Sequence, residues 1–264
     1  MDVLSQVVAA LQAWPPEALW PLMLVVCFGS ALVMYRLFGE AGLYAYIVLA
    51  ILGANIQVLK VVQFSIYPEP VALGTVLFSS TFLATDILAE HHGATSARKA
   101  VMLGFVSYLV FTVFMLLTMG FHPLTPEEAG TEMAWALPYH EHITALFSRS
   151  PALLIAGMIA YLTSQYHDVW LYERLRRAFQ GRRLWLRNNL STALSALIDN
   201  LIFSVFAWII LAPEPLPLKT VLLVYVLGTY WLRLIVALLD TPFLYLAHRV
   251  RPEGTPGGAA VEVM

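Results

Sequence analysis

The chain has 264 residues, of which 59% are hydrophobic and only 12% are charged, and its formal net charge is −2. This composition excludes an ordinary soluble domain and favours a protein that lies within a lipid bilayer. The near-zero charge gives no support to nucleic-acid binding. The lone Cys27 cannot form an intramolecular disulfide. No positive charge precedes Arg36, so a cleavable signal peptide is not expected.

Apolar stretches of about 20 residues, the length that crosses the hydrocarbon core, recur along the chain. They predict seven membrane spans, at 18–38, 42–64, 71–90, 98–121, 151–172, 191–212 and 218–248. Proline clusters between several spans are typical of turns. The polar segment 122–149 predicts a surface region with a short helix. The glycine- and proline-rich tail is expected to be disordered.

Basic residues concentrate in one set of loops between these spans. That set holds Arg36, Arg98, Lys99, Arg174, Arg176, Arg177, Arg182, Arg183, Arg187, Arg249 and Arg251, and the arginines at 174–183 are suited to lipid headgroups. Only Arg149 and Lys219 fall in the opposite set. Because basic loops stay in the cytoplasm, the N-terminus is predicted outside and the C-terminus in the cytoplasm.

Several ionisable side chains nevertheless fall inside the apolar stretches. They are Lys60, Asp86, Glu90, Asp168, Asp199, Arg233 and Asp240. A charge at mid-membrane costs about 2.5–3.5 kcal/mol on insertion scales, so proteins keep one where it lines a cavity or a path. The pattern therefore predicts a protein that handles a polar solute.

These charges belong to polar stripes at helical spacing, which predict one central cavity shared by five helices. The stripes supply the candidate residues for substrate binding or ion coupling: Asn55, Gln57, Lys60, Phe82, Asp86, Gln165, Asp168, Asp199, Phe203, Tyr230, Arg233 and Asp240. Asp86 and Asp199 lie deepest and are favoured for ligand contact or coupling.

Other candidates have structural explanations of similar weight. Lys60 and Arg233 are equally suited to pair with carboxylates that hold the helices together. Two histidines follow Glu90, so a position at the cytoplasmic surface is favoured for it. Asp168 lies close enough to the cytoplasmic end to act as a structural cap. Asp240 precedes Thr241-Pro242, and the proline favours a kink that either builds a polar site or serves packing.

Motifs of other chemistry are weak. His140-Glu141-His142 lies in a predicted loop without a second ligand pair, so a metal site is not expected. The chain has no nucleophile elbow, P-loop or zinc-protease motif. We therefore expect no catalytic residue, no cofactor and no enzyme activity.

Ordered sequence blocks resemble the queuosine-precursor transporter family, which is also labelled a vitamin uptake transporter family. The blocks are FLATDILAE at 82–90, ARK at 97–99, AYL at 160–162, SQ at 164–165, HDV at 167–169, LWLRNN at 184–189, ST at 191–192, LID at 197–199 and ALLDTPF at 237–243. Asn55 and Lys60 also fit the family's early helix. Leu190 departs from the pattern, because many members have glycine there, and this weakens any transfer of a role to Asn188 and Asn189.

The resemblance implies an all-α membrane fold with a six-helix core. Residues 42–249 would form this core, residues 1–41 an extra N-terminal helix with its flanks, and residues 250–264 a disordered cytoplasmic tail. It further implies import of 7-deazaguanine bases, such as the cyano or aminomethyl precursor or queuine, across the cytoplasmic membrane. The partners would be this small solute and membrane lipid, with no nucleic acid; a homodimer stays open.

The candidate residues suit such a base. A guanine-like ring offers adjacent N–H donors that one carboxylate accepts together, and a flat face for aromatic stacking. Asp86 or Asp199 would read that edge, and Phe82, Phe203 and Tyr230 would stack. Two alternatives stay open. In the first, the chain is a capture subunit that needs a separate ATP-driven module, or it imports another purine-like or vitamin solute. In the second, it is a membrane enzyme or signalling protein that uses the cavity otherwise.

Overall fold

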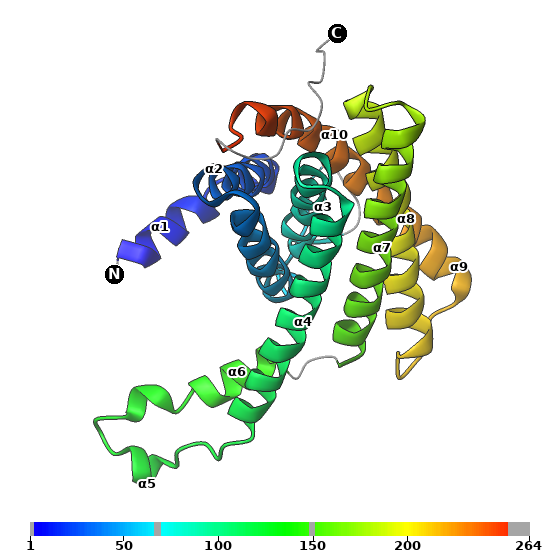
Figure 1. Ribbon diagram of the computed structural model, residues 1–264. Helices are drawn as coiled ribbons and strands as arrows, with labels where there is room; N and C mark the ends of the chain where they lie inside the picture. Colours follow the sequence, from blue (N-terminus) through cyan, green and yellow to red (C-terminus); the bar gives the residue numbers. More distant parts are fainter. Residues whose placement is uncertain (1–2, 66–69, 148–150, 253–264) are drawn as a thin grey trace.

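The computed structural model describes residues 3–65, 70–147 and 151–252, and most of them are helical (Figure 1). The helical segments are α1 (Val3–Gln12), α2 (Pro16–Gln57), α3 (Gly74–His91), α4 (Ala94–Met119), α5 (Pro126–Ala129), η1 (Ala134–Ala136), α6 (Tyr139–Phe147), α7 (Pro151–Ala178), α8 (Leu184–Val205), η2 (Phe206–Ile210), α9 (Leu218–Thr220), η3 (Val221–Leu227) and α10 (Gly228–Arg249). The segments η2 and η3 are π-helical and continue α8 and precede α10. The predominantly helical fold agrees with the sequence prediction.

Helix α2 is a helical hairpin, although its residues are helical almost throughout. The Tyr46 hydroxyl donates to the Cys27 carbonyl over 2.8 Å. In a straight helix these residues would lie about 28 Å apart along the axis. The reversal occurs at Gly39, whose φ of 59° and ψ of −136° suit only glycine. A Cβ at Gly42 would overlap the Met34 carbonyl, so the two arms approach closely there. The hairpin accounts for the first two predicted spans.

The second arm of α2 is shorter than predicted. It ends at Gln57 and is followed by a turn and a two-stranded antiparallel ribbon, β1 (Val61–Val62) with β2 (Val71–Ala72). In this ribbon Val61 lies opposite Ala72, and Val62 lies opposite Val71. The predicted span to residue 64 is therefore wrong at its end, and Lys60 lies in a turn with an exposed side chain.

Four helical segments are long and apolar enough to cross a bilayer: Pro16–Gln57, Ala94–Met119, Leu184–Ile210 and Leu218–Arg249. Helices α3 and α7 occupy two further predicted spans, and their hydropathy is lowered by the buried acids Asp86 and Glu90 on α3 and Asp168 on α7. Helix α7 continues beyond residue 172 to Ala178, and α8 begins at Leu184 rather than at 191. The count of seven spans and the orientation of the termini stay predictions.

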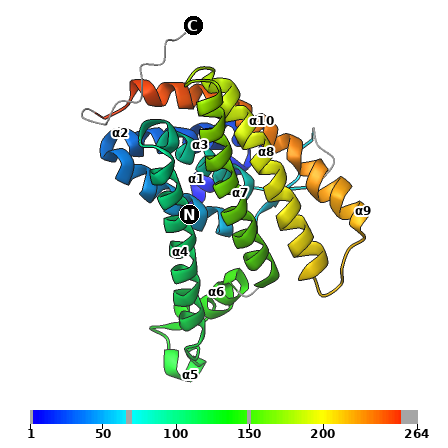
Figure 2. The same ribbon diagram turned by 45° about the vertical axis from the view of Figure 1, so that its right-hand side comes forward.

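Helix α3 lies at the centre of the bundle and packs against α2, α4, α7 and α10. Helices α7 and α8 run side by side, while α5, η1 and α6 extend away from the bundle below α4 (Figures 1 and 2). The predicted surface region at 122–149 contains α5, η1 and α6 up to Phe147. Of the predicted tail at 250–264, only residues 250–252 are described, so the expected disorder lies outside the described residues.

Candidate functional site

Buried polar side chains converge where α3, α7, α8 and α10 meet. Helices α3, α7 and α8 each contribute a stripe with residues about one turn apart, and α10 contributes Asp240. We call this set the polar core: Thr81, Thr85, Asp86, Glu90, Ser164, Gln165, Asp168, Tyr172, Arg187, Asn188, Ser191, Ser195, Asp199 and Asp240, all of them buried.

One end of the polar core is closed by the Arg187 cluster, made of Glu90, Tyr172, Arg176 and Arg187. The Arg187 guanidinium makes a two-pronged contact with Glu90, from Nη1 to Oε2 at 3.0 Å and from Nη2 to Oε1 at 3.2 Å. The Tyr172 hydroxyl donates to Glu90 Oε2 over 2.9 Å, and Arg176 Nε lies 3.8 Å from the same oxygen. Both Glu90 oxygens thus have donors.

This cluster overturns two sequence expectations. The sequence favours the cytoplasmic surface for Glu90, yet its side chain is only 5% exposed. The sequence places Arg187 among the loop arginines, yet its side chain is 0% exposed. The reason is that α8 begins at Leu184, which places Arg187 in the first turn of a packed helix rather than in a loop.

The other end holds the Arg233 cluster, made of Phe78, Ser164, Asp199 and Arg233. Arg233 Nη1 lies 2.6 Å from Asp199 Oδ2, and the Ser164 hydroxyl donates to Asp199 Oδ1 over 3.0 Å. The Arg233 guanidinium also lies 5.8 Å from the centre of the Phe78 ring. Of the two explanations for Arg233, pairing with a carboxylate is the one that this geometry supports.

Between the two clusters lies the acid layer, made of Asp86, Asp168 and Asp240. Its position follows from α7, where Asp168 comes one turn after Ser164 of the Arg233 cluster and one turn before Tyr172 of the Arg187 cluster. All three carboxyl groups are buried. Asp240 accepts a hydrogen bond from Asn188 Nδ2 over 2.7 Å.

Asp86 and Asp168 differ from every other acid of the polar core. Among the described residues, none places a donor in hydrogen-bonding geometry on any of their four carboxyl oxygens. The groups that face Asp168 are the hydroxyls of Ser191 and Ser195 and the carboxyl of Asp86 itself. Burying a carboxylate without a donor or cation is unfavourable, so this pair is a candidate site for a proton or for a ligand that carries donors.

Gln165 is already occupied by neighbouring side chains. Its Nε2 donates to Thr81 Oγ1 over 2.8 Å, and its Oε1 accepts from Thr85 Oγ1 over 3.2 Å. Both partners lie on α3, so Gln165 links α7 to α3. The predicted role in ligand binding would require these two bonds to break.

Several predicted residues lie outside the polar core. Asn55 Nδ2 donates to its own helix at Ile51, and the residue lines a small cavity of about 30 Å³ with Phe78 and Tyr161. Tyr230 donates to the Ala193 carbonyl over 2.9 Å. The remaining predicted residues lie as follows: Gln57 is half-buried near the end of α2, Lys60 is exposed, Phe82 is buried within α3, and Phe203 is half-buried on α8.

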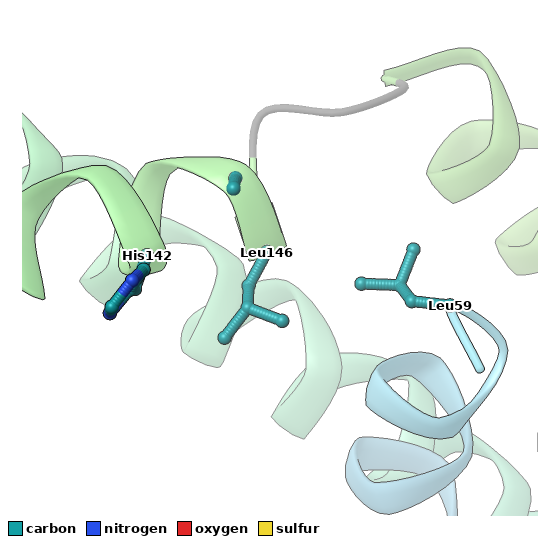
Figure 3. Close-up of a pocket in the computed structure, with 4 residues that line it drawn as sticks. Leu59, His142 and Leu146 are labelled. Atoms are coloured by element: carbon teal, nitrogen blue, oxygen red, sulfur yellow. The ribbon is translucent and has the colours of Figure 1, made fainter.

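A second hollow lies away from these charges, between α6 and the end of α2 (Figure 3). It has a volume of about 380 Å³ and is lined by Leu59, His142, Ala145 and Leu146. Its walls are almost wholly apolar, so they offer few hydrogen-bonding groups to a polar solute. The polar core is therefore the stronger candidate site.

Comparisons with known proteins agree with a role in transport. The family described as "putative vitamin uptake transporter" matches residues 72–247, a stretch that contains all the acids of the polar core. A relative from Bacillus subtilis (strain 168), named "probable queuosine precursor transporter", is 33% identical over 237 residues, which cover 89% of this chain and 96% of the relative. No solved structure matches the chain. The chain thus belongs to the putative vitamin uptake transporter family and is a multi-pass transport protein of the cell membrane.

Proposed function

We propose that the protein imports 7-deazaguanine bases, such as the cyano or aminomethyl precursor of queuosine or queuine, across the cytoplasmic membrane. The name of the Bacillus subtilis relative supports this class of substrate. The chemistry of the polar core supports it as well. A 7-deazaguanine presents neighbouring N–H donors on one edge, and the polar core contains carboxylate oxygens that lack donors.

The single observation that carries the proposal is the unsatisfied pair Asp86 and Asp168. One carboxylate accepts both N–H groups of a guanine-like edge, which would satisfy a group that is otherwise buried without a donor. Sequence alone left Asp86 and Asp199 as equal candidates for this role. Because Asp199 is held by Arg233 and Ser164, we assign the edge to Asp86.

Transport would proceed by alternating access around this layer. The Arg187 and Arg233 clusters lie at its two ends, and each links two helices through an ion pair. Opening one cluster while the other stays closed would expose the acid layer to one side of the membrane only. In this proposal the Arg187 and Arg233 ion pairs close the two ends of the transport path, and the base binds in the acid layer between them.

The proposed topology keeps seven spans, with residues 1–41 as an extra N-terminal span, 42–249 as the core and 250–264 as a cytoplasmic tail. Glu132 would then lie outside and Arg177 in the cytoplasm. Cys27 is buried, so single introduced cysteines are readable against it. A membrane-impermeant maleimide should label Glu132→Cys in intact cells and Arg177→Cys only after permeabilisation. The reverse pattern would overturn the orientation.

The function is tested in cells that lack both queuosine synthesis and their own importer. These cells would express the unsubstituted chain, Asp86→Asn or the control Glu173→Gln, which lies on α7 in a surface ion pair with Arg177. We expect uptake of radiolabelled cyano base, and queuosine in tRNA, with the unsubstituted chain and the control. Asp86→Asn should lose at least ten-fold in initial rate at equal membrane expression.

Other outcomes of this experiment are equally informative. Uptake that survives Asp86→Asn but not Asp199→Asn would move the binding role to Asp199. A well-expressed chain without uptake of any 7-deazaguanine base would contradict the proposal. Uptake that appears only when an ATPase module is added would identify a capture subunit instead.

A further inference from the structure

The charges of the polar core do not balance. It contains the acids Asp86, Glu90, Asp168, Asp199 and Asp240, and the basic side chains that form ion pairs with these acids are arginines. Arg187 is engaged by Glu90, and Arg233 is engaged by Asp199. Within the part of the chain that the structure describes, no ion pair reaches Asp86, Asp168 or Asp240.

Charged groups on four helices face Asp86. Glu90 lies on the same helix, Asp168 faces it from α7, Arg187 from α8 and Asp240 from α10. Acids thus outnumber bases around Asp86, and the only base among these groups already holds Glu90. Two adjacent carboxyl groups in such a setting do not both stay ionised, because like charges repel and burial disfavours the charged form. A shared proton removes both costs.

A chain of polar groups leads from this pair toward the periphery of the bundle. The Ser195 hydroxyl faces Asp168 and also lies 2.9 Å from His167 Nδ1. His167 is only half-buried and lies beside the exposed Trp170, with ring centres 5.7 Å apart. Histidine exchanges protons readily near neutral pH, and a serine hydroxyl both donates and accepts. Asp168 therefore has a route for proton exchange that leaves both arginine clusters closed.

On the basis of the proposed import function, we propose that the Asp86–Asp168 pair carries one proton that moves with each transported base. In the loaded state the proton neutralises one carboxyl group, and the other accepts the N–H edge of the base. After the base and the proton are released, Arg187 is the cation that can neutralise the ionised pair while the empty transporter returns to its outward-facing state. Arg187 lies opposite Asp86 as well as Glu90, so it can shift toward the acid layer when the proton leaves.

The test uses the purified full chain in liposomes with radiolabelled cyano base, which is neutral. An imposed pH gradient, acidic outside, should accumulate the base several-fold above equilibrium, and a protonophore should abolish this accumulation. A neutral base that moves with a proton carries one positive charge, so an inside-negative potential should also accelerate uptake.

Substitutions separate coupling from transport. Asp168→Asn should lose accumulation driven by the pH gradient, because the remaining Asp86 carboxyl group cannot both accept the base and carry the proton. Ser195→Ala should slow proton-driven uptake several-fold and leave exchange unchanged, because the route through His167 is interrupted. The control Glu173→Gln should behave as the unsubstituted chain.

The two proposals fail in different ways. Exchange that proceeds normally while accumulation ignores both the pH gradient and the protonophore would refute proton coupling and leave import standing. Absence of exchange in the unsubstituted chain would refute the import function itself. If Asp168→Asn does not reconstitute, the protonophore experiment on the unsubstituted chain and the Ser195→Ala variant decide the question.

Discussion

The Arg187 cluster and the acid layer are neighbours on the same helices, yet they treat buried charge in opposite ways. In the Arg187 cluster, both Glu90 oxygens accept hydrogen bonds from charged or phenolic donors. One turn away on α3 and α7, Asp86 and Asp168 have no donor in bonding geometry among the described residues. We call a cluster saturated when every carboxylate oxygen has a hydrogen-bond donor. A saturated cluster holds helices together, whereas carboxylates without donors are suited to a ligand that binds and dissociates.

The largest expected effect is on the saturated cluster. Arg187→Met should lower the free energy of unfolding by about 3–5 kcal/mol, because it leaves Glu90 buried without its main cation. Equilibrium unfolding in detergent, followed by tryptophan fluorescence, measures this change. Arg182→Ala, at an exposed position on the preceding loop, is the control and should stay within about 0.5 kcal/mol.

A second substitution shows whether the loss comes from the unpaired acid. Adding Glu90→Leu to Arg187→Met removes the stranded carboxylate and should restore much of the lost stability. A double variant as unstable as Arg187→Met would mean that packing of the arginine, and not its charge, holds this end of the bundle.

The phenol of Tyr172 tests a weaker contribution to the same cluster. Tyr172→Phe keeps the ring, whose centre lies 5.2 Å from the Arg187 guanidinium, and removes one hydrogen bond to Glu90. A hydrogen bond to a charged acceptor contributes about 1.5–3 kcal/mol. Tyr230→Phe removes a bond to a neutral carbonyl, so its loss should be smaller, at about 0.5–1.5 kcal/mol. Equal losses of unfolding free energy in the two variants would mean that the Tyr172 hydroxyl gains nothing extra from bonding to a charged Glu90.

Substitution in the acid layer should raise the free energy of unfolding instead of lowering it. Asp86→Asn removes a buried group that has no cation, so stability should rise by roughly 1 kcal/mol while uptake falls. Asp199→Asn is the matched contrast, because it deprives Arg233 of its partner and should destabilise the protein. Loss of stability in Asp86→Asn would show that Asp86 has a structural role and would weaken its assignment to the substrate.

The sequence predicted the inward stripes but not all of their members. Spacing by four residues placed Phe82, Asp86 and Glu90 on one face of α3, and the structure buries all three. Extending the α8 stripe backwards from Asp199 through Ser195 and Ser191 leads to Arg187, so the periodicity did contain the signal. The start of α8 is hard to locate from the sequence, because loop arginines precede Arg187 and Arg183 makes no side-chain cap at the helix start.

Hydrogen-bond partners were beyond prediction for a different reason. The spacing of Gln165, Asp168 and Asp199 shows which way they point, but not which side chain on another helix satisfies them. Only the packing of α7 against α3 reveals that Gln165 is bonded to Thr81 and Thr85. Likewise, the reversal at Gly39 was expected as a break between spans, whereas its tight geometry depends on contact between the two arms of α2.

Lys60 should give the smallest effect, and it tests the boundary of the polar core. Sequence periodicity placed it on a continuous helix facing the cavity, but α2 ends at Gln57 and the Lys60 side chain is exposed. Lys60→Ala should therefore change stability by less than about 0.5 kcal/mol and uptake by less than two-fold. The contrast is Arg233→Ala, which removes a cation that is only 13% exposed and lies in contact with Asp199. A ten-fold loss of uptake in Lys60→Ala at normal stability would mean that the transport path begins at the β1–β2 ribbon. The exposed lysine would then have to contact the substrate before the substrate reaches the acid layer.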